Sequence, residues 1–261
     1  MSTILHAESF GNAPDKVLFL HGFMGCASDW QPIISFLKND HCCIAMDLPG
    51  HGKSVGVAQD LTWDFRFVAN AVIETLVKMD AVPCDLVGYS MGGRLALYLA
   101  LTFPKYFRRV VLESASPGLR TPDERAKRQQ TDQTLALRLE NEPFSGFLDD
   151  WYRQPLFATL RNHSNFELLF RRRNQNQPKL LAKSLRELGT GVQPSLWDAL
   201  PELKNPMVLL VGEKDVKFRA IAEQMQSHNA QISIEIVQNT GHNIHAESPV
   251  VFANVVQRFL R

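Results

Sequence analysis

The stretch that most constrains the fold is CDLVGYSMGGRLALYLA, residues 84–100, in which an apolar strand-like run meets an apolar helix-like run at a serine. Gly88, Ser90 and Gly92 form a G-x-S-x-G pattern at this junction. Glycines on both sides of the serine allow a sharp strand-to-helix turn from which the hydroxyl projects. An ordinary glycine-rich turn could have the same glycines, but the flanking strand and helix favour a nucleophile at Ser90.

Six short apolar runs between turn residues predict the strands of one sheet. They are KVLFL, HCCIAMD, CDLVGY, RRVVLE, PMVLLVG and ISIEIV. Three longer stretches have the apolar spacing of helices, over residues 61–79, 94–103 and 218–228. Strands that alternate with helices and are apolar throughout predict an α/β fold with a mostly parallel, doubly wound sheet.

The alternation of strands and helices stops between residues 118 and 200. Charged segments with helical spacing fill this region, and no continuous apolar strand occurs in it. Four prolines interrupt it, Pro143, Pro155, Pro178 and Pro194. We therefore expect residues 118–200 to form a helical lid, or cap, inserted into a core made of residues 1–117 and 201–261.

The charge balance excludes several classes of partner. The 261 residues include 28 Lys and Arg against 27 Asp and Glu, a net charge of +1, which provides no field for binding nucleic acid or an anionic membrane. No signal-peptide pattern begins the chain and no run of about 18 apolar residues occurs, so we expect no membrane insertion. A small molecule is the expected partner, and the sequence leaves the oligomeric state open.

The cysteines and histidines show no metal-binding spacing. Cys26, Cys42, Cys43 and Cys84 form no C-x-x-C pair, and no H-E-x-x-H motif occurs. We therefore expect no metal and no cofactor. Cysteines without a disulfide pattern are typical of a reducing compartment, which predicts a cytoplasmic protein.

A catalytic serine needs a histidine as its base, and the histidine needs an acid that fixes its tautomer. With this serine pattern the chain order is Ser, then Asp or Glu, then His. Asp215 follows the strand-like MVLLVG, and His242 follows ISIEIV and a glycine, so both would emerge beside Ser90 at the carboxyl edge of the sheet. The alternative base is His245, and the alternative acids are Glu213 and Glu113.

The segment HGFMG, residues 21–25, follows the first strong apolar run. At this place the architecture takes one backbone donor for an oxyanion hole, and the second donor comes from the residue after the nucleophile. We therefore predict that the backbone amides of Phe23 and Met91 stabilise the oxyanion.

Arg94 places a permanent positive charge in an otherwise apolar helix. It lies four residues after Ser90, so both residues face the same side of the helix and the guanidinium can border the catalytic cavity. A buried charge is costly unless it is matched, and arginine binds carboxylates through two parallel hydrogen bonds. Arg94 therefore either binds a substrate carboxylate or forms an internal salt bridge with an acidic residue.

These residues resemble the α/β-hydrolase fold superfamily over the whole chain, and DLPGHGKS at residues 47–54 is also typical of it. More narrowly, the chain resembles the 2-succinyl-6-hydroxy-2,4-cyclohexadiene-1-carboxylate synthase family of menaquinone and phylloquinone biosynthesis. The similar segments are GYSMGGR, SPGLRTPDERAKRQQTD, DDWYRQPLFATL, VGEKDVKFRAIA and TGHNIHAESP. They include the lid, which is the part expected to vary most between activities.

The resemblance implies a set of substrate-binding residues. In that family, arginines of the helix after the nucleophile and of the lid bind substrate carboxylates, and the matching positions here are Arg94, Arg128 and Arg172. The lid tryptophan of DWYRQP becomes Trp151, and Tyr89 adjoins the serine. Trp151 could instead belong to the core of the lid. Neighbouring arginines are alternatives in the same segments, namely Arg125 for Arg128 and either Arg171 or Arg173 for Arg172.

The resemblance also implies a reaction. The family eliminates pyruvate from 2-succinyl-5-enolpyruvyl-6-hydroxy-3-cyclohexene-1-carboxylate, a polyanion, and consumes no water. The chain would then be a lyase in which Ser90 removes a proton next to a ketone, while His242, held by Asp215, receives the serine proton. The same triad could serve a serine hydrolase of carboxylesters or of carbon–carbon bonds. A ligand-binding receptor with slow turnover is the alternative outside the enzymes.

Overall fold

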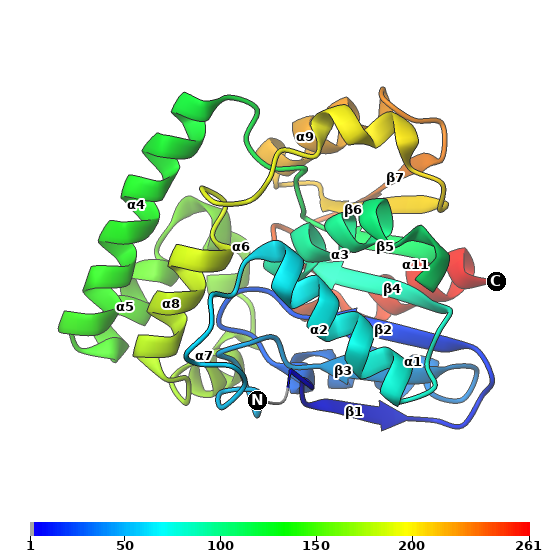
Figure 1. The fold of residues 1–261 in the computed structure, drawn as a ribbon, viewed down its shortest axis with the longest axis horizontal. Helices are drawn as coiled ribbons and strands as arrows, with labels where there is room; N and C mark the ends of the chain where they lie inside the picture. The colour runs from blue at the N-terminus through cyan, green and yellow to red at the C-terminus, as the bar shows by residue number, and fades with distance from the viewer. Residues whose placement is uncertain (1–2) are drawn as a thin grey trace.

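The computed structural model describes residues 3–261, which form one seven-stranded sheet with helices on both faces (Figure 1). The strand order is β1-β3-β2-β4-β5-β6-β7. The edge strand β1 (Ala7–Phe10) is antiparallel to β3, and the other neighbouring strands are parallel. The predicted mostly parallel α/β sheet is confirmed, whereas the sequence patterns do not predict β1.

The parallel strands coincide with the six apolar runs of the sequence. They are β2 (Lys16–Leu20), β3 (Cys42–Met46), β4 (Cys84–Tyr89), β5 (Phe107–Glu113), β6 (Met207–Gly212) and β7 (Ile232–Val237). All residues of β4 and β6 are buried, because helices cover both faces of these strands. Since β4 to β7 are parallel neighbours, their carboxyl ends meet at one edge of the sheet.

Alternate residues of the strands point into two separate cores. Leu18 and Leu86 face the core that contains α2 (Phe65–Lys78), α3 (Met91–Thr102) and α9 (Val216–Gln226). Phe19 and Val87 face the core that contains α1 (Gln31–Leu37) and α11 (Pro249–Leu260). Shorter helices lie in the connections, η1 (Ala27–Trp30), η2 (Pro104–Tyr106), η4 (Trp197–Glu202) and α10 (Ile244–Glu247).

Between β5 and β6 the chain, described there without a gap, forms a helical layer beside the sheet, on the left in Figure 1. Its helices are α4 (Pro122–Asn141), α5 (Phe144–Tyr152), η3 (Pro155–Phe157), α6 (Ala158–Arg161), α7 (Phe166–Arg173) and α8 (Pro178–Leu188). Their apolar side chains form a third core, which Met24 of the HGFMG loop joins. We call this layer the lid. Its boundaries at residues 118 and 200 stay a prediction.

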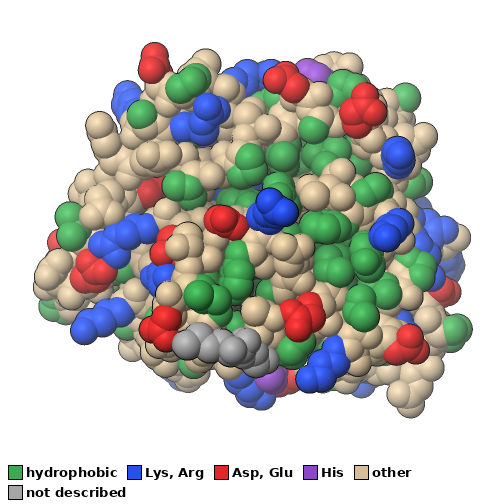
Figure 2. Space-filling model, in the orientation of Figure 1, with side chains coloured by type: hydrophobic (Ala, Val, Ile, Leu, Met, Phe, Trp, Pro, Cys, Tyr) green, Lys and Arg blue, Asp and Glu red, His purple; other side chains and the backbone are tan. Residues whose placement is uncertain are grey.

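The surface charges are mixed, as the near-zero net charge of the sequence leads one to expect, and the cysteines are unpaired. Figure 2 shows positive and negative side chains interspersed over one face of the molecule. Cys26, Cys42, Cys43 and Cys84 are free, and burial raises the pKa of the Cys43 and Cys84 thiols to about 12. No helix among residues 3–261 is both long enough and apolar enough to cross a membrane.

Candidate active site

The turn between β4 and α3 holds Ser90 in a strained backbone conformation. Its φ of +49° lies in the left-handed region, which residues other than glycine rarely adopt. The Ser90 amide donates to the Glu113 carbonyl (2.9 Å), and the Ser90 carbonyl accepts from the Arg94 amide (2.9 Å). Gly92 allows the first turn of α3 to approach the carbonyl oxygen of Leu20, which a Cβ atom would strike. The turn predicted from the G-x-S-x-G pattern is therefore present.

Ser90, His242 and Asp215 form one hydrogen-bonded chain. Nδ1 of His242 lies 2.7 Å from Oδ2 of Asp215, and Nε2 lies 3.3 Å from Oγ of Ser90. A carboxylate only accepts hydrogen bonds, so Nδ1 carries the proton and Nε2 is left to accept the serine proton. His242 and Asp215 are buried, while Ser90 is half-buried. The geometry is that of an acid, a base and a nucleophile in series.

The alternative acids have other partners. Asp215 is the N-cap residue of α9, where it also accepts from the Phe218 amide (3.4 Å), and this helps to fix its carboxylate. Glu213 accepts from the Asn239 amide (2.9 Å). Glu113 binds His245, which was the alternative base. The structure thus pairs Asp215 with His242 and assigns the alternative acid and base to each other.

Two buried histidines hold the HGFMG loop in place. Nε2 of His21 accepts from the Leu48 amide (3.0 Å), and Nε2 of His51 accepts from the Met24 amide (3.2 Å). The Nδ1 atom of each ring donates to a nearby backbone carbonyl. Burial lowers the pKa of both histidines, that of His51 to about 3, so both rings are neutral at neutral pH. The segments HGFMG and DLPGHGKS are therefore joined in one network.

The HGFMG loop runs against the serine turn. A Cβ atom on Gly22 would lie 2.6 Å from the ring of Tyr89, so this close approach requires glycine. Within residues 3–261, neither the Phe23 amide nor the Met91 amide donates a hydrogen bond to another residue. Both amides are therefore available to an oxygen of a bound substrate. Their assignment to an oxyanion hole stays a prediction.

The Arg94 guanidinium lies where α3 meets the lid. Nη1 donates to the Leu188 carbonyl at the end of α8 (2.9 Å) and to Oε1 of Gln193 (3.3 Å). No carboxylate oxygen of residues 3–261 lies within 4.0 Å of it. Burial and the positive charge of Arg128 lower the pKa of Arg94 to about 9, although Asp132 opposes this shift. Arg94 is therefore charged at neutral pH without an acidic partner, which argues against the internal salt bridge.

Arg128 approaches Arg94 from the lid. It lies in α4, where its Nε atom is 2.7 Å from Oδ1 of Asp132. The buried Asp132 also accepts from the Gly191 amide (3.2 Å) and so connects α4 to the segment after α8. Arg125 donates instead to backbone carbonyls just before α4. Arg94 and Arg128 thus form a pair of neighbouring cations that share one carboxylate nearby.

The arginines at the end of α7 point in different directions. Arg171 is exposed and pairs with Glu167 (2.8 Å). Arg173 is buried and pairs with Asp29 of η1, with Nη2 2.7 Å from Oδ2. Burial would raise the pKa of Asp29, but the charge and hydrogen bonds of Arg173 lower it to about 2. The innermost arginine of the run is therefore Arg173, and it is fully paired.

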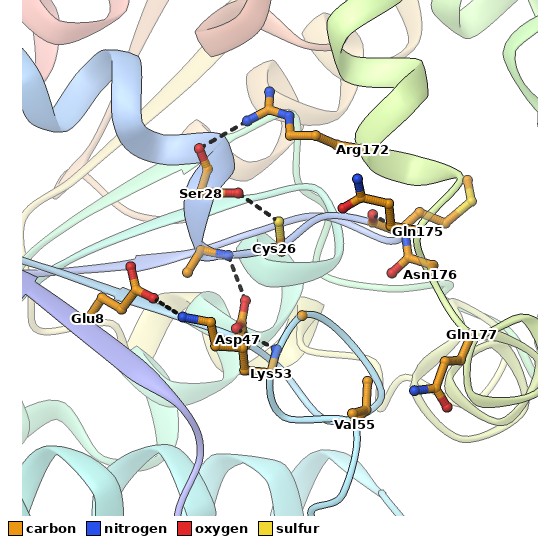
Figure 3. Close-up of a pocket in the computed structure, with 13 residues that line it drawn as sticks. Glu8, Cys26, Ser28, Asp47, Lys53, Val55, Arg172, Gln175, Asn176 and Gln177 are labelled. Atoms are coloured by element: carbon orange, nitrogen blue, oxygen red, sulfur yellow. Dashed lines mark hydrogen bonds and ion pairs between the residues drawn. The ribbon is translucent and has the colours of Figure 1, made fainter.

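Arg172 is half-buried, in contrast to the exposed Arg171 and the buried Arg173. Its Nη1 atom donates to the Ser28 carbonyl (3.1 Å), as Figure 3 shows, and lies 3.5 Å from Oδ1 of Asp29. The side chain lines a cavity of about 350 Å³ between η1 and the lid loop after α7. Neither Ser90 nor His242 lines this cavity. The structure therefore does not bring Arg172 together with the triad, and its role in substrate binding stays a prediction.

Aromatic residues connect the lid to the triad. The ring of Trp151 lies 5.3 Å from that of Phe23 and 6.2 Å from that of Phe157. Phe157 in turn lies 6.0 Å from the His242 ring. Tyr89 is buried, and its ring lies 5.6 Å from that of His242. Trp151 thus contacts both the core of the lid and the HGFMG loop, so both of its predicted roles stay open.

Sequence reasoning missed the residues that support the site. Gln193 is buried between Arg94 and the Ser116 carbonyl, to which its amide donates (3.0 Å). His51 belongs to DLPGHGKS, a segment typical of the α/β-hydrolase fold, but no sequence pattern indicates its hydrogen bond to the Met24 amide.

Residues 3–261 contain no group of three or more His, Cys, Asp and Glu side chains placed to hold a metal ion.

Comparisons with known proteins agree with this geometry. A family model described as the alpha/beta hydrolase family matches residues 17–255. The 2-succinyl-6-hydroxy-2,4-cyclohexadiene-1-carboxylate synthase of Salmonella typhimurium is 35% identical over 262 residues, which cover 99% of each chain. The protein of the same name from Escherichia coli O1:K1 is 36% identical over 97% of this chain and 98% of its own. Protein PHYLLO, chloroplastic, of Arabidopsis thaliana is 35% identical over 95% of this chain, which spans only 16% of its length.

Solved structures give the same assignment. MenH from S. aureus has a TM-score of 0.93 and 32% identity, and the match covers 98% of this chain and 97% of that one. A thermophilic esterase from Thermogutta terrifontis, with malate bound, has a TM-score of 0.83 at 24% identity over 98% and 93% of the two chains, which shows a shared fold. The resemblance found in the sequence is thus confirmed, and the chain belongs to the alpha/beta hydrolase family and, within it, to the 2-succinyl-6-hydroxy-2,4-cyclohexadiene-1-carboxylate synthase family.

Proposed function

We propose that this chain is a lyase of menaquinone or phylloquinone biosynthesis. It eliminates pyruvate from 2-succinyl-5-enolpyruvyl-6-hydroxy-3-cyclohexene-1-carboxylate and leaves 2-succinyl-6-hydroxy-2,4-cyclohexadiene-1-carboxylate. Family membership supports the reaction. The observation that carries the choice of substrate is the half-buried Arg94 guanidinium, which has no carboxylate within 4.0 Å among residues 3–261. A substrate with several carboxylates supplies that partner.

Ser90 acts as a base in this proposal. Its oxygen removes the proton from the ring carbon next to the succinyl ketone, while Nε2 of His242, 3.3 Å away, takes the hydroxyl proton. The electrons of the broken C–H bond form an enolate. When the ketone re-forms, the ring gains its second double bond and the bond to the enolpyruvyl oxygen breaks. The departing enolpyruvate takes the proton from His242 at its methylene carbon and becomes pyruvate.

The other residues of the site stabilise charge in this sequence. Asp215 holds the His242 ring and stabilises the imidazolium that forms. The amides of Phe23 and Met91 donate to the enolate oxygen, and losing one such donor costs about 100-fold to 1,000-fold in rate. Arg94 and Arg128 bind carboxylates of the substrate. Binding roles for three further residues rest on the motif resemblance alone, Tyr89, Trp151 and Arg172.

The test is an assay of pyruvate release from the cyclohexene substrate by the purified chain. We expect turnover without added nucleotide, and a fall of about 100-fold to 10,000-fold in Ser90→Ala, because the variant lacks the base. Hydrolysis of simple esters without pyruvate release would contradict the proposal and favour a serine hydrolase. Tight binding with very slow turnover would contradict it in favour of a receptor.

The proposal also covers the binding partner of the chain and its location in the cell. The partner is a small polyanion, and we propose a cytoplasmic location because the four cysteines are free, as in reducing compartments. Fractionation of the native cell with detection of the chain tests this location. Its recovery with the secreted or periplasmic proteins would contradict it.

A further inference from the structure

Glu113 and His245 form a second buried acid–histidine pair beside the triad. Oε2 of Glu113 lies 2.6 Å from Nδ1 of His245, and Oε1 accepts from the His245 amide at 3.0 Å. Glu113 is 0% exposed and His245 is 3% exposed. The proposed reaction uses neither residue. Desolvation offsets much of the attraction in such a pair, so stability alone is a weak reason for its presence.

Glu113 contacts Ser90 directly and contacts His245, which lies three residues after His242. Its backbone carbonyl accepts from the Ser90 amide (2.9 Å) and so holds the turn in which Ser90 has a positive φ. Its carboxylate holds His245 by both the backbone and the side chain, three residues after His242. One residue at the end of β5 therefore contacts both the serine turn after the neighbouring strand β4 and helix α10, which begins two residues after His242.

Aromatic rings fix the His245 imidazole as well. The indole of Trp30 stacks on it with ring centroids 4.4 Å apart, and Tyr89 meets it edge-on at 4.8 Å. The same Tyr89 ring lies 5.6 Å from that of His242. His245 is therefore connected to His242 both along the backbone and through the Tyr89 ring.

We infer that Glu113 is a positioning residue that sets the separation between His242 Nε2 and Ser90 Oγ. It does so by holding His245 and the serine turn at the same time. This separation of 3.3 Å must be kept during proton transfer, and an error of about 1 Å costs about 100-fold in rate. The kinetic test of this inference rests on the proposed function, whereas its spectroscopic test does not.

Asp85 provides a matched control near the start of β4, at the edge of the sheet opposite Glu113. It is 1% exposed, and its carboxylate accepts from the Arg108 side chain (2.8 Å) and from the Arg109 amide (3.1 Å). Glu113 and Asp85 are thus buried strand carboxylates that each accept from one backbone amide, and the side-chain partners are His245 for Glu113 and the guanidinium groups of Arg108 and Arg109 for Asp85. The variants Glu113→Gln and Asp85→Asn make the same chemical change at opposite edges of the sheet.

We expect Glu113→Gln to lower kcat for pyruvate release by about 10-fold to 100-fold while KM stays within about threefold, because the substrate contacts are kept. Asp85→Asn should lower thermal stability to a similar degree and leave kcat unchanged. In proton NMR spectra, the far-downfield resonance of the His242 Nδ1 proton is assigned by its loss in His242→Ala. That resonance should shift or disappear in Glu113→Gln and persist in Asp85→Asn.

An unchanged kcat and an unchanged His242 resonance in folded Glu113→Gln would overturn the inference. If Glu113→Gln does not fold, His245→Gln is measured in the same way, and a lower kcat supports the inference while an unchanged one overturns it. If the wild-type chain releases no pyruvate, the proposed function fails. The NMR comparison of the variants then decides the inference by itself.

Discussion

Arg94 and Arg173 both lie between the core and the lid, but their surroundings are opposite. Arg173 is 3% exposed and forms an ion pair with Asp29, and its pKa is raised because the attraction to Asp29 outweighs burial. Arg94 has only a backbone carbonyl and an amide oxygen as acceptors, and burial together with Arg128 lowers its pKa to about 9. Arg173 is neutralised by the protein itself, whereas Arg94 is not.

The difference separates an arginine paired within the protein from one that we propose binds a substrate carboxylate. The Arg173–Asp29 pair joins α7 of the lid to η1 of the core, so it fixes the lid in place. Arg94 is charged at neutral pH at a free-energy cost that Asp132, the one acid acting on it, offsets only in part, since the pKa of Arg94 is still lowered. A bound carboxylate would reduce this cost, and in the proposed function this would favour an anionic substrate.

The largest expected effect is on stability, at the paired arginine. Arg173→Met removes the buried partner of Asp29 and leaves this carboxylate only the longer contact with the half-buried Arg172 (3.5 Å), so we expect the free energy of unfolding in urea to fall by about 3–5 kcal/mol. Arg171→Met is the control from the same run, and it should cause no measurable change because the Arg171–Glu167 pair is exposed. A loss of unfolding free energy below about 1 kcal/mol in Arg173→Met would contradict the structural role that distinguishes Arg173 from Arg94.

At the unpaired arginine we expect the opposite result. Arg94→Met should leave the free energy of unfolding unchanged or raise it, while kcat/KM for pyruvate release falls by about 30-fold to 3,000-fold, since a substrate carboxylate loses its partner. Urea denaturation and the pyruvate assay on one preparation measure both. Arg138→Met, in which a lid arginine paired with Glu142 and Asp150 is removed, is the control that should retain activity. Unfolding of Arg94→Met with no specific loss of activity would restore the internal structural role.

His51 is a third basic residue for this comparison, and unlike Arg94 and Arg173 it is uncharged at neutral pH. Its pKa falls from the ordinary 6.5 to about 3 because it is buried, so between these values the unfolded chain binds a proton that the folded chain does not. Stability must therefore decrease as the pH falls through this window. We expect His51→Gln to reduce this loss by on the order of 2–3 kcal/mol at pH 4.5, measured by urea unfolding at pH 4.5 and 7. Identical pH dependence in both proteins would show that His51 does not carry the effect.

The smallest expected effect concerns the orientation of Arg94. Gln193→Met removes the Oε1 acceptor that Arg94 uses, so the guanidinium becomes less well ordered before substrate binds. We expect KM to rise by about threefold to tenfold with little change in kcat, as for the loss of one ordinary hydrogen bond. Initial rates over a range of substrate concentrations measure this. A fall in kcat alone would indicate that Gln193 acts on the chemical step.

The sheet and the triad could be predicted because local patterns carry them. The run ending at Ser90 needs apolar residues for a buried strand and glycines for the turn, and both requirements are visible within about ten residues. Asp215 and His242 each follow an apolar strand, and parallel strands bring their carboxyl ends together. The arrangement of the triad therefore follows from topology once the strands are recognised.

The partners of the arginines could not be predicted, because they depend on contacts between distant segments. Arg94 meets Leu188, 94 residues away along the chain, and no local pattern indicates how α8 lies over α3. The RRR run has no spacing that fixes its register, so only the packing of α7 on η1 decides that Arg173 is innermost. The bond between His51 and the Met24 amide likewise joins two loops whose approach the sequence does not encode locally.

Calorimetric titration of the cyclohexadiene product into Ser90→Ala and into Ser90→Ala/Arg94→Met tests the central claim most directly, because it measures binding without turnover. If the uncompensated charge of Arg94 is the carboxylate site, the second variant should bind about 30-fold to 3,000-fold more weakly at an unchanged free energy of unfolding. Equal affinities in the two variants would contradict the claim that Arg94 selects the substrate.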